Sequence, residues 1–329
     1  MKLSILISTK NREKILIQTI NSIISESDFD KANYEIIITN DGEPFSEIDI
    51  ANYQPYNINI VKNSGRGLAA GRNNGTKYAH GEVLLFYDDD ILPTKNHFNR
   101  HVQLHDKYEN VIITANRFYP DNLIQIAKKT PFGRYKLQYE YNWLEGLNLV
   151  PASVENQDVF YCETLAGFSC SMRKTTYDII GGFNENFPAA GCEDSEFFYR
   201  ASKNDIKLIF DQSNICYHNE LDNFQLKQWL NRQASGIIGA IVICKLHPEG
   251  KEHPTYYLNT PIQKYDSNKI KRIKRKRTLL SFTLIKKLIF TCIYFGEKLK
   301  LSDLILFRLY NAAWLGATKH SFIKTYKKY

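Results

Sequence analysis

The stretch Gly81–Pro93, GEVLLFYDDDILP, joins an apolar run directly to three consecutive aspartates. Glu82–Tyr87 has the length and composition of a buried β-strand, so Asp88, Asp89 and Asp90 stand at its carboxyl end. If the strand continues, Asp88 and Asp90 point to the same face. An isolated D-D-D is more often a solvated loop, but after a buried strand it favours a site for Mg²⁺ or Mn²⁺, because adjacent carboxylates repel one another without a cation.

Short apolar runs alternate with helical stretches upstream of this segment, which predicts βαβ units and a mainly parallel sheet in an α/β fold. The predicted strands are Lys2–Ser8, Tyr34–Thr39 and Ile58–Val61, and the predicted helices are Arg12–Ser25 and Leu68–His80. Ligands of open α/β sheets bind outside the carboxyl ends of the strands. Thr9, Asp41 and Asp88–Asp90 are therefore expected to converge on a site of nucleotide size.

Two phosphate-binding motifs are not matched. Gly65, Gly67 and Gly71 have the wrong last spacing for the dinucleotide fingerprint and follow the third strand rather than the first. The sequence also contains no G-x-x-x-x-G-K-[ST] motif. These observations argue against a Rossmann cofactor site and a P-loop.

Length and composition describe a globular chain with a substantial core. It has 329 residues, 43% of them hydrophobic, which suggests one large domain with an addition, or two domains. Its 6 cysteines form no C-x-x-C pair, so free thiols are expected. The apolar run near the N-terminus is too short for a signal peptide or a membrane span, which favours a cytoplasmic protein.

Charge is distributed unevenly. Residues 262–329 contain 17 Lys and Arg but only 3 Asp and Glu, whereas the preceding body is mildly acidic. This asymmetry indicates an anionic target for the tail, such as a membrane surface or a polyanion, and gives no reason to expect nucleic-acid binding by the body.

The tail also has an apolar pattern. Lys286-Lys287 interrupts the longest apolar interval, so a membrane span is not expected. Leu280, Leu284, Leu288 and Tyr294-Phe295 lie near one helical face, beside the basic Lys271–Arg277. The pattern predicts an amphipathic helix at a membrane interface. The alternative is a helical appendage that packs on the rest of the chain or on a sister subunit.

An ordered set of motifs resembles family 2 glycosyltransferases of the GT-A fold. It comprises TKNR at Thr9–Arg12, NDG at Asn40–Gly42, GLAAGRNNG at Gly67–Gly75, GEVLLFYDDDILP at Gly81–Pro93, GGFNENF at Gly181–Phe187 and CEDSEFFYRA at Cys192–Ala201. YHNE at Tyr217–Glu220 is similar to the Y-H-x-E of chondroitin-polymerase-type members. The resemblance covers roughly residues 1–220. It implies a GT-A, Rossmann-like catalytic domain there. A helical connection over 221–261 and a basic helical tail over 262–329 are expected to follow that domain.

The resemblance implies an inverting transfer of sugar from a nucleoside diphosphate donor, with UDP-sugar preferred, to a glycan or lipid-linked acceptor. It assigns nucleotide contacts to Thr9, Asn11, Arg12, Asp41, Arg72, Asp88 and Asp89. Asp90, His218 and Asp88 would bind Mn²⁺ or Mg²⁺. Without the family match, His218 would more often be a hydrogen-bonded core histidine.

The second acid of Glu193-Asp194 matches the family's catalytic base, and one carboxylate suffices to accept the proton of the acceptor hydroxyl. Glu193 and Trp143 are then expected to contact the acceptor. The alternatives are that both acids only complement a helix dipole and that the aromatic segment around Trp143 is a packed helix face.

Two rival functions remain at this point. A nucleotidyltransferase should carry a glycine-rich stretch after its first strand, whereas Ser8–Arg12 contains no glycine. A non-catalytic sugar-binding or scaffold protein on the same fold should have lost Asp90 or Asp194, and both are present. The expected setting is cytoplasmic, with attachment to the inner face of the membrane and homo-oligomer formation as open expectations.

Overall fold

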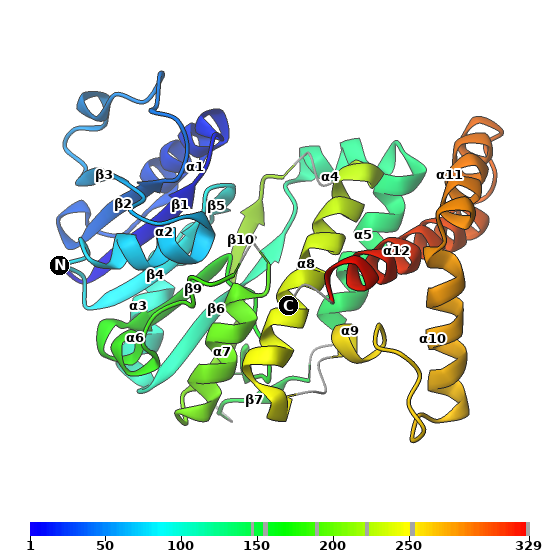
Figure 1. Cartoon of the computed structure of the whole chain (residues 1–329). Coiled ribbons are helices and arrows are strands. Elements are labelled where there is room, and N and C mark those ends of the chain that lie inside the picture. Colours follow the sequence, from blue (N-terminus) through cyan, green and yellow to red (C-terminus); the bar gives the residue numbers. More distant parts are fainter. Residues whose placement is uncertain (146–147, 154–156, 188–190, 221–223, 251–253, 327–329) are drawn as a thin grey trace. The chain divides into compact units, whose positions relative to one another are not determined.

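A computed structural model describes residues 1–145, 148–153, 157–187, 191–220, 224–250 and 254–326. The chain forms two compact units, which are described separately (Figure 1). Unit 1 comprises residues 1–120, 147–186 and 193–220, and unit 2 comprises residues 121–146, 187–192 and 221–329.

A large sheet forms the centre of unit 1. Its strands in the described residues are β1 (Leu3–Thr9), β2 (Tyr34–Asn40), β3 (Ile58–Lys62), β4 (Val83–Asp88), β5 (Ile91–Pro93), β6 (Val111–Phe118), β7 (Val150–Pro151), β8 (Val159–Tyr161), β9 (Ser169–Arg173) and β10 (Lys207–His218). The order is β3-β2-β1-β4-β9-β6-β10-β8-β7, and β5 pairs with β10. Strands β3, β2, β1 and β4 are parallel neighbours, as are β6 and β10, while β9 lies antiparallel between β4 and β6. The mainly parallel α/β sheet expected from the sequence is confirmed.

Both faces of the sheet are covered by helices, because successive strand residues point to opposite sides. The unit contains α1 (Glu13–Glu26), α2 (Gly67–Thr76), α3 (His97–Lys107), α6 (Lys174–Ile180) and α7 (Glu193–Lys203), with short 3₁₀ turns at Lys31–Asn33 and Ile50–Tyr53. Ile5 and Ile7 pack in one core cluster with residues of α1 and α3, and Leu6 packs in another with residues of α2, α6 and α7. The strands are therefore apolar on both faces, which is why they read as continuous hydrophobic runs.

The Asn-rich helix α2 connects two of the recognised motifs. Asn73 Nδ2 donates to the Phe183 carbonyl and Asn73 Oδ1 accepts from the Phe183 N–H, each at 2.8 Å. Asn74 Nδ2 donates to the Lys62 carbonyl at 2.9 Å. These amides join α2 to the end of β3 and to the GGFNENF loop, and so fix the position of Arg72 between them.

Unit 2 is helical in the part that the structure describes. It contains α4 (Asp121–Lys128), α5 (Pro131–Glu145), α8 (Leu226–Leu246), a 3₁₀ turn (Pro248–Gly250), α9 (Pro254–Tyr257), α10 (Asn268–Ser281), α11 (Thr283–Lys298) and α12 (Asp303–Thr325). Phe132, Trp229, Ile293 and Tyr310 belong to one apolar cluster that joins α5, α8, α11 and α12. Residues 121–146 were expected within the catalytic domain of residues 1–220, whereas their contacts group α4 and α5 with the C-terminal helices.

The basic side chains of α10 are divided between the interior of unit 2 and its surface. Lys274 and Arg277 are buried, while Arg272, Arg275 and Lys276 are exposed. Lys274 Nζ donates to Asp266 Oδ2 at 2.9 Å and to Thr260 Oγ1 at 3.0 Å. Lys271–Arg277 was expected to act as a polybasic cluster, but hydrogen-bond acceptors inside unit 2 hold Lys274 and Arg277.

Within the described residues, no single helix is both long and apolar enough to cross a membrane. The pair α10 and α11 meets the length and composition requirement only in combination, and it bends by 81° at the break between the two helices.

Candidate functional site

The polar ends of four strands of unit 1 supply the candidate site. Strand β1 ends at Thr9, β2 at Asn40, β4 at Asp88 and β10 at His218. These four strands run in one direction, so their carboxyl ends lie along the same edge of the sheet. This is the arrangement expected from the sequence.

The three consecutive aspartates have different partners. Asp88 Oδ1 accepts from Arg72 Nη2 at 3.1 Å, and its side chain is 33% exposed. Desolvation raises the pKa of Asp88 despite the lowering influence of Arg72. Asp88 is thus a partly open carboxylate beside a buried guanidinium.

Asp89 is held inside unit 1. Its Oδ2 accepts from Thr9 Oγ1 at 2.5 Å and its Oδ1 accepts from Arg12 Nη1 at 2.5 Å, while Thr19 donates to its backbone carbonyl at 2.7 Å. Desolvation raises the pKa of Asp89 to about 6, against the opposing effect of Arg12. The carboxylate joins β1 and α1 to the turn after β4.

Asp90 belongs to a buried cluster with His218 and Glu220. His218 Nε2 lies 3.2 Å from Asp90 Oδ1 and 3.4 Å from Glu220 Oε2. One ligand atom from each of the three residues lies within 4.8 Å of the others. The second Asp90 oxygen accepts from Arg12 Nη2 at 2.7 Å. Two carboxylates and one imidazole converge here.

The donor set of this cluster fits Mn²⁺ or Mg²⁺. Carboxylate oxygens suit both ions, and an imidazole adds a preference for Mn²⁺. Desolvation lowers the pKa of His218 although Asp90 opposes this effect, so the neutral ring keeps a lone pair for a metal. Although desolvation acts in the opposite direction, His218 and Arg12 hold the pKa of Asp90 below its usual value, which keeps that ligand ionised.

Glu220 was not singled out from the sequence, although the YHNE motif contains it. β10 ends at His218, and Glu220 follows two residues later with its Oε2 3.4 Å from His218 Nε2, so both side chains can reach one ion. Asn219 N donates to the Asp90 carbonyl at 2.7 Å and aligns the two segments. The His-x-Glu spacing was the signal that could have identified Glu220.

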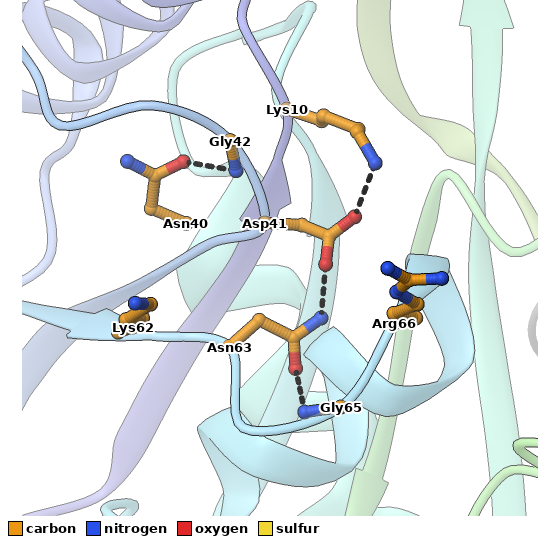
Figure 2. Close-up of a pocket in the computed structure, with 8 residues that line it drawn as sticks. All are labelled: Lys10, Asn40, Asp41, Gly42, Lys62, Asn63, Gly65 and Arg66. Carbon is orange, nitrogen blue, oxygen red and sulfur yellow. Dashed lines mark hydrogen bonds and ion pairs between the residues drawn. The ribbon is translucent and has the colours of Figure 1, made fainter.

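A pocket of about 380 Å³ lies at the ends of β2 and β3. Its lining residues are Lys10, Asn40, Asp41, Gly42, Lys62, Asn63, Gly65 and Arg66 (Figure 2). Asp41 Oδ2 accepts from Lys10 Nζ at 3.0 Å and Asp41 Oδ1 accepts from Asn63 Nδ2 at 2.8 Å (Figure 2). The pocket thus presents one carboxylate between two hydrogen-bond donors.

Of the base-pocket residues expected from the sequence, only Asp41 lines this pocket. Thr9 bonds to Asp89, and Asn11 adopts a left-handed conformation with φ 54° and accepts from the Glu43 N–H at 3.0 Å. Sequence reasoning missed Asn63, which follows β3 as Asp41 follows β2. The strand-end rule could have identified it.

Arg72 connects the aspartates of β4 to the acids of α7. It is 4% exposed and contacts Asp88, Glu193 Oε1 at 3.3 Å and the Gly167 carbonyl at 3.1 Å. The Gly167 N–H donates to Asp194 Oδ2 at 3.1 Å. A Cβ at Gly167 would lie 3.0 Å from the Asp194 Cβ, so Asp194 would have to shift by a few tenths of an ångström to admit a larger residue.

Asp194 is half-buried at the start of α7, and Glu193 is buried. Asp194 Oδ1 accepts from the Ser195 N–H at 2.7 Å and from the Ser195 hydroxyl at 3.4 Å, so both carboxylate oxygens are oriented by hydrogen bonds. Trp143 belongs to α5, but its side chain lies outside the described part of the structure. Its neighbours Tyr135 and Tyr139 pack in the apolar core of unit 2, as the packed-face alternative predicts.

Comparison with known proteins decides the family. The family model described as glycosyl transferase family 2 matches residues 4–173, more than half of the chain. The chain belongs to glycosyl transferase family 2. The matched segment includes the strand ends and the three aspartates of the candidate site.

Two relatives illustrate the range of similarity. An uncharacterized glycosyltransferase YwdF of Bacillus subtilis (strain 168) is 31% identical over 211 residues, covering 62% of this chain and 69% of the relative. Chondroitin synthase of Escherichia coli is 26% identical over 239 residues, covering 66% of this chain and 34% of the relative. The chain spans less than two thirds of most of the curated relatives it matches.

Similarity to solved structures establishes the GT-A fold. The structure of GalNAc-T7 with UDP, GalNAc and Mn²⁺ has a TM-score of 0.58 and 14% identity, covering 84% of this chain and 54% of that one. At this identity the match supports the fold and not the choice of substrate. The expected GT-A, Rossmann-like arrangement is confirmed.

Proposed function

We propose that this family 2 member transfers a sugar, with inversion, from a UDP-sugar to a hydroxyl of a glycan or lipid-linked acceptor. The observation that carries the proposal is that unit 1 brings three structural features together near the ends of its strands. These are an Asp41 pocket, a buried Asp90–His218–Glu220 cluster and an oriented Asp194 carboxylate. The catalytic domain is proposed to extend over residues 1–220.

The chemistry of the Asp41 pocket favours uracil. The uracil edge presents a carbonyl, an N–H and a second carbonyl; Asp41 can accept from the N–H, and Lys10, whose side chain is 64% exposed, can donate to a carbonyl. Asp88 and Arg72 lie at the end of β4, where they would contact the rest of the nucleotide.

Asp90, His218 and Glu220 are the residues that would hold Mn²⁺ or Mg²⁺. A divalent ion there would neutralise the charge of the diphosphate leaving group. Arg12 supplies positive charge to Asp89 and Asp90 in the present geometry. Its guanidinium side chain is 40% exposed, so it can also turn toward a phosphate oxygen.

Asp194 is the proposed base. As the acceptor oxygen forms its bond to the anomeric carbon, Asp194 takes the hydroxyl proton, and the bond from that carbon to the diphosphate breaks with its electron pair on the leaving oxygen. The hydrogen bonds from Gly167 and Ser195 orient the carboxylate. Glu193, held by Arg72, is proposed to contact the acceptor, together with Trp143.

The polymeric product named for chondroitin synthase favours a glycan acceptor, without choosing its sugar or linkage. We place the reaction in the cytoplasm because it uses a nucleotide-sugar donor. The alternative is that the helical region forms a homo-oligomer, and the light-scattering experiment below tests this.

A panel of nucleotide sugars tests the proposal. With Mn²⁺ present, UDP-sugars should raise the melting temperature more than GDP-sugars, since a ligand at about 100 times its Kd adds roughly 2.7 kcal/mol of stability. Asp41→Asn should remove this preference, while Asp49→Asn, outside the pocket, should retain it. Equal stabilisation by all bases, or preference for GDP, would refute the uridine assignment.

A further inference from the structure

Helix α11 has two apolar faces, and only one of them is covered in unit 2. Ile289, Ile293 and Gly296 are buried on the inner face, and Ile289 and Ile293 pack in the core shared with α12. Leu284, Leu288 and Phe295 are 78%, 58% and 52% exposed. At 100° per residue, these three side chains lie within one narrow arc of the helix, away from the buried residues.

The exposed apolar surface continues past both ends of α11. We define the outer face as these three residues together with Leu279, Phe282, Tyr294, Leu299, Leu301 and Leu304, all exposed. Soluble monomers rarely expose a continuous surface of large apolar side chains, and such surfaces mark protein or membrane contacts. The outer face is therefore expected to contact a protein or a membrane.

Basic side chains surround the outer face. Lys287, Lys298 and Lys300 are exposed along and just beyond α11. Arg272, Arg275 and Lys276 are exposed on α10, which meets α11 at a bend of 81° (Figure 1).

The acids of this segment are engaged inside unit 2. Asp266 pairs with Lys274 at 2.9 Å, Glu297 accepts from Tyr310 at 2.5 Å, and Asp303 pairs with Arg134 at 2.6 Å. These are all the acids of residues 262–329. The exposed basic residues thus surround an apolar surface with no other carboxylates in their own segment.

We propose that the outer face of α11 inserts into the headgroup region of an anionic lipid bilayer, with the exposed basic residues of α10 and α11 contacting lipid phosphates. An apolar face rimmed by Lys and Arg is the combination that binds anionic membrane interfaces. A surface that binds a protein partner more often has a polar rim that contains charges of both signs. The proposal is independent of the catalytic assignment, because binding is measured without donor or acceptor.

Vesicle co-sedimentation of the full chain tests this proposal. Binding to vesicles of phosphatidylcholine with 30% phosphatidylglycerol should exceed binding to pure phosphatidylcholine by at least about tenfold, and should weaken as salt screens the charges. Leu284→Ser/Leu288→Ser/Phe295→Ser should reduce binding to anionic vesicles by about tenfold or more. The control pair Ile262→Ser/Tyr265→Ser removes exposed apolar groups outside the outer face and should bind like the parent.

Charge variants separate the electrostatic part. Arg272→Gln/Arg275→Gln/Lys276→Gln should reduce binding and its salt dependence, whereas Lys14→Gln/Lys77→Gln/Lys107→Gln in unit 1 should leave both unchanged. Donor hydrolysis by the serine triple variant should remain at the parent level, which shows that it is folded. Failure of the full chain to bind anionic vesicles would overturn the proposal. A dimer in light scattering that the serine variant alone abolishes, without vesicle binding, would assign the outer face to a second copy.

Discussion

Two runs of like charge, Asp88–Asp90 in unit 1 and Lys271–Arg277 in unit 2, are divided among different contacts by the fold. In the acidic run, Asp88 meets Arg72, Asp89 meets Thr9 and Arg12, and Asp90 meets His218 and Arg12. In the basic run, two side chains are buried and others are exposed. Adjacent charges in sequence therefore do not share one role.

The two regions differ in where their unmatched charge lies. The carboxylates of unit 1 are buried around a cluster that fits a divalent ion, so the positive charge that balances them must belong to a small ligand. The exposed cations of unit 2 lie beside an apolar helix face, so the negative charge that balances them can belong to an extended surface. Burial thus distinguishes an ion site from a docking surface better than charge alone.

The largest effect is expected at Asp194. Asp194→Asn should lower kcat by roughly two to four orders of magnitude with nearly unchanged UDP affinity, because the amide keeps the shape but cannot accept the acceptor's proton. Asp178→Asn, exposed on α6, is the matched control. Steady-state kinetics and calorimetry on both variants measure the effect. A dead Glu193→Gln beside an active Asp194→Asn would reverse the assignment of the two acids.

Inside unit 2, we expect Lys274 to matter for stability and Lys276 not to. Lys274→Met leaves Asp266 buried without its cation and should cost about 3–5 kcal/mol of the free energy of unfolding. Lys276→Met changes an exposed side chain and should stay within about 0.5 kcal/mol. Urea denaturation followed by tryptophan fluorescence is suitable, since Trp143, Trp229 and Trp314 all belong to unit 2. Equal stability of the two variants would contradict the division of the basic run.

A smaller, pH-dependent effect is expected in unit 1. His97, His101 and His105 lie buried along α3, where desolvation lowers their pKa values, to about 4 for His97 and about 3 for His105. The unfolded chain binds protons below about 6.5 while the folded state does not, so stability falls as the pH drops from there toward 4. At pH 5, His97 and His105 should each cost about 2 kcal/mol.

Hydrogen exchange in β9 measures this loss, because Ser169 and Ser171 bond to the three histidines at 2.8–3.4 Å. Exchange of peptides covering residues 97–105 and 169–173 should accelerate between pH 7 and pH 5 after correction for the intrinsic rate. His105→Gln keeps a hydrogen bond to Ser171 within reach. It should lower by one the number of protons that the chain takes up on unfolding in this pH range. A corrected rate that is independent of pH would exclude this account.

The sequence was sufficient for the first half of the fold because β1, β2 and β4 are buried on both faces and form nearly continuous apolar runs. The expected strand Tyr34–Thr39 is observed as β2, and the strand-end rule located Asp41 and Asp88. The helix expected over Leu68–His80 ends at Thr76, where the chain tightens into bonds from Lys77 and Tyr78 to carbonyls three residues earlier.

Other features depend on long-range partners that a periodic pattern does not reveal. The inward stripe of α10 is Lys274, Arg277 and Ser281, which is polar, so an apolar periodicity cannot detect it. The predicted continuous face from Leu280 to Leu288 is broken at Phe282, between α10 and α11. In the site, the separate partners of Asp88, Asp89 and Asp90 come from residues up to 128 positions away, as for Asp90 and His218.

The most direct test of the central claim is a calorimetric titration of UDP into the full chain, with Mn²⁺ and with EDTA. If the buried carboxylates of unit 1 are completed by a metal and the donor, Mn²⁺ should raise UDP affinity by at least about 100-fold. Glu220→Gln should lose most of this gain, and Glu249→Gln, exposed in unit 2, should keep it. Equal UDP affinity with Mn²⁺ and with EDTA would contradict a metal site built on Asp90, His218 and Glu220.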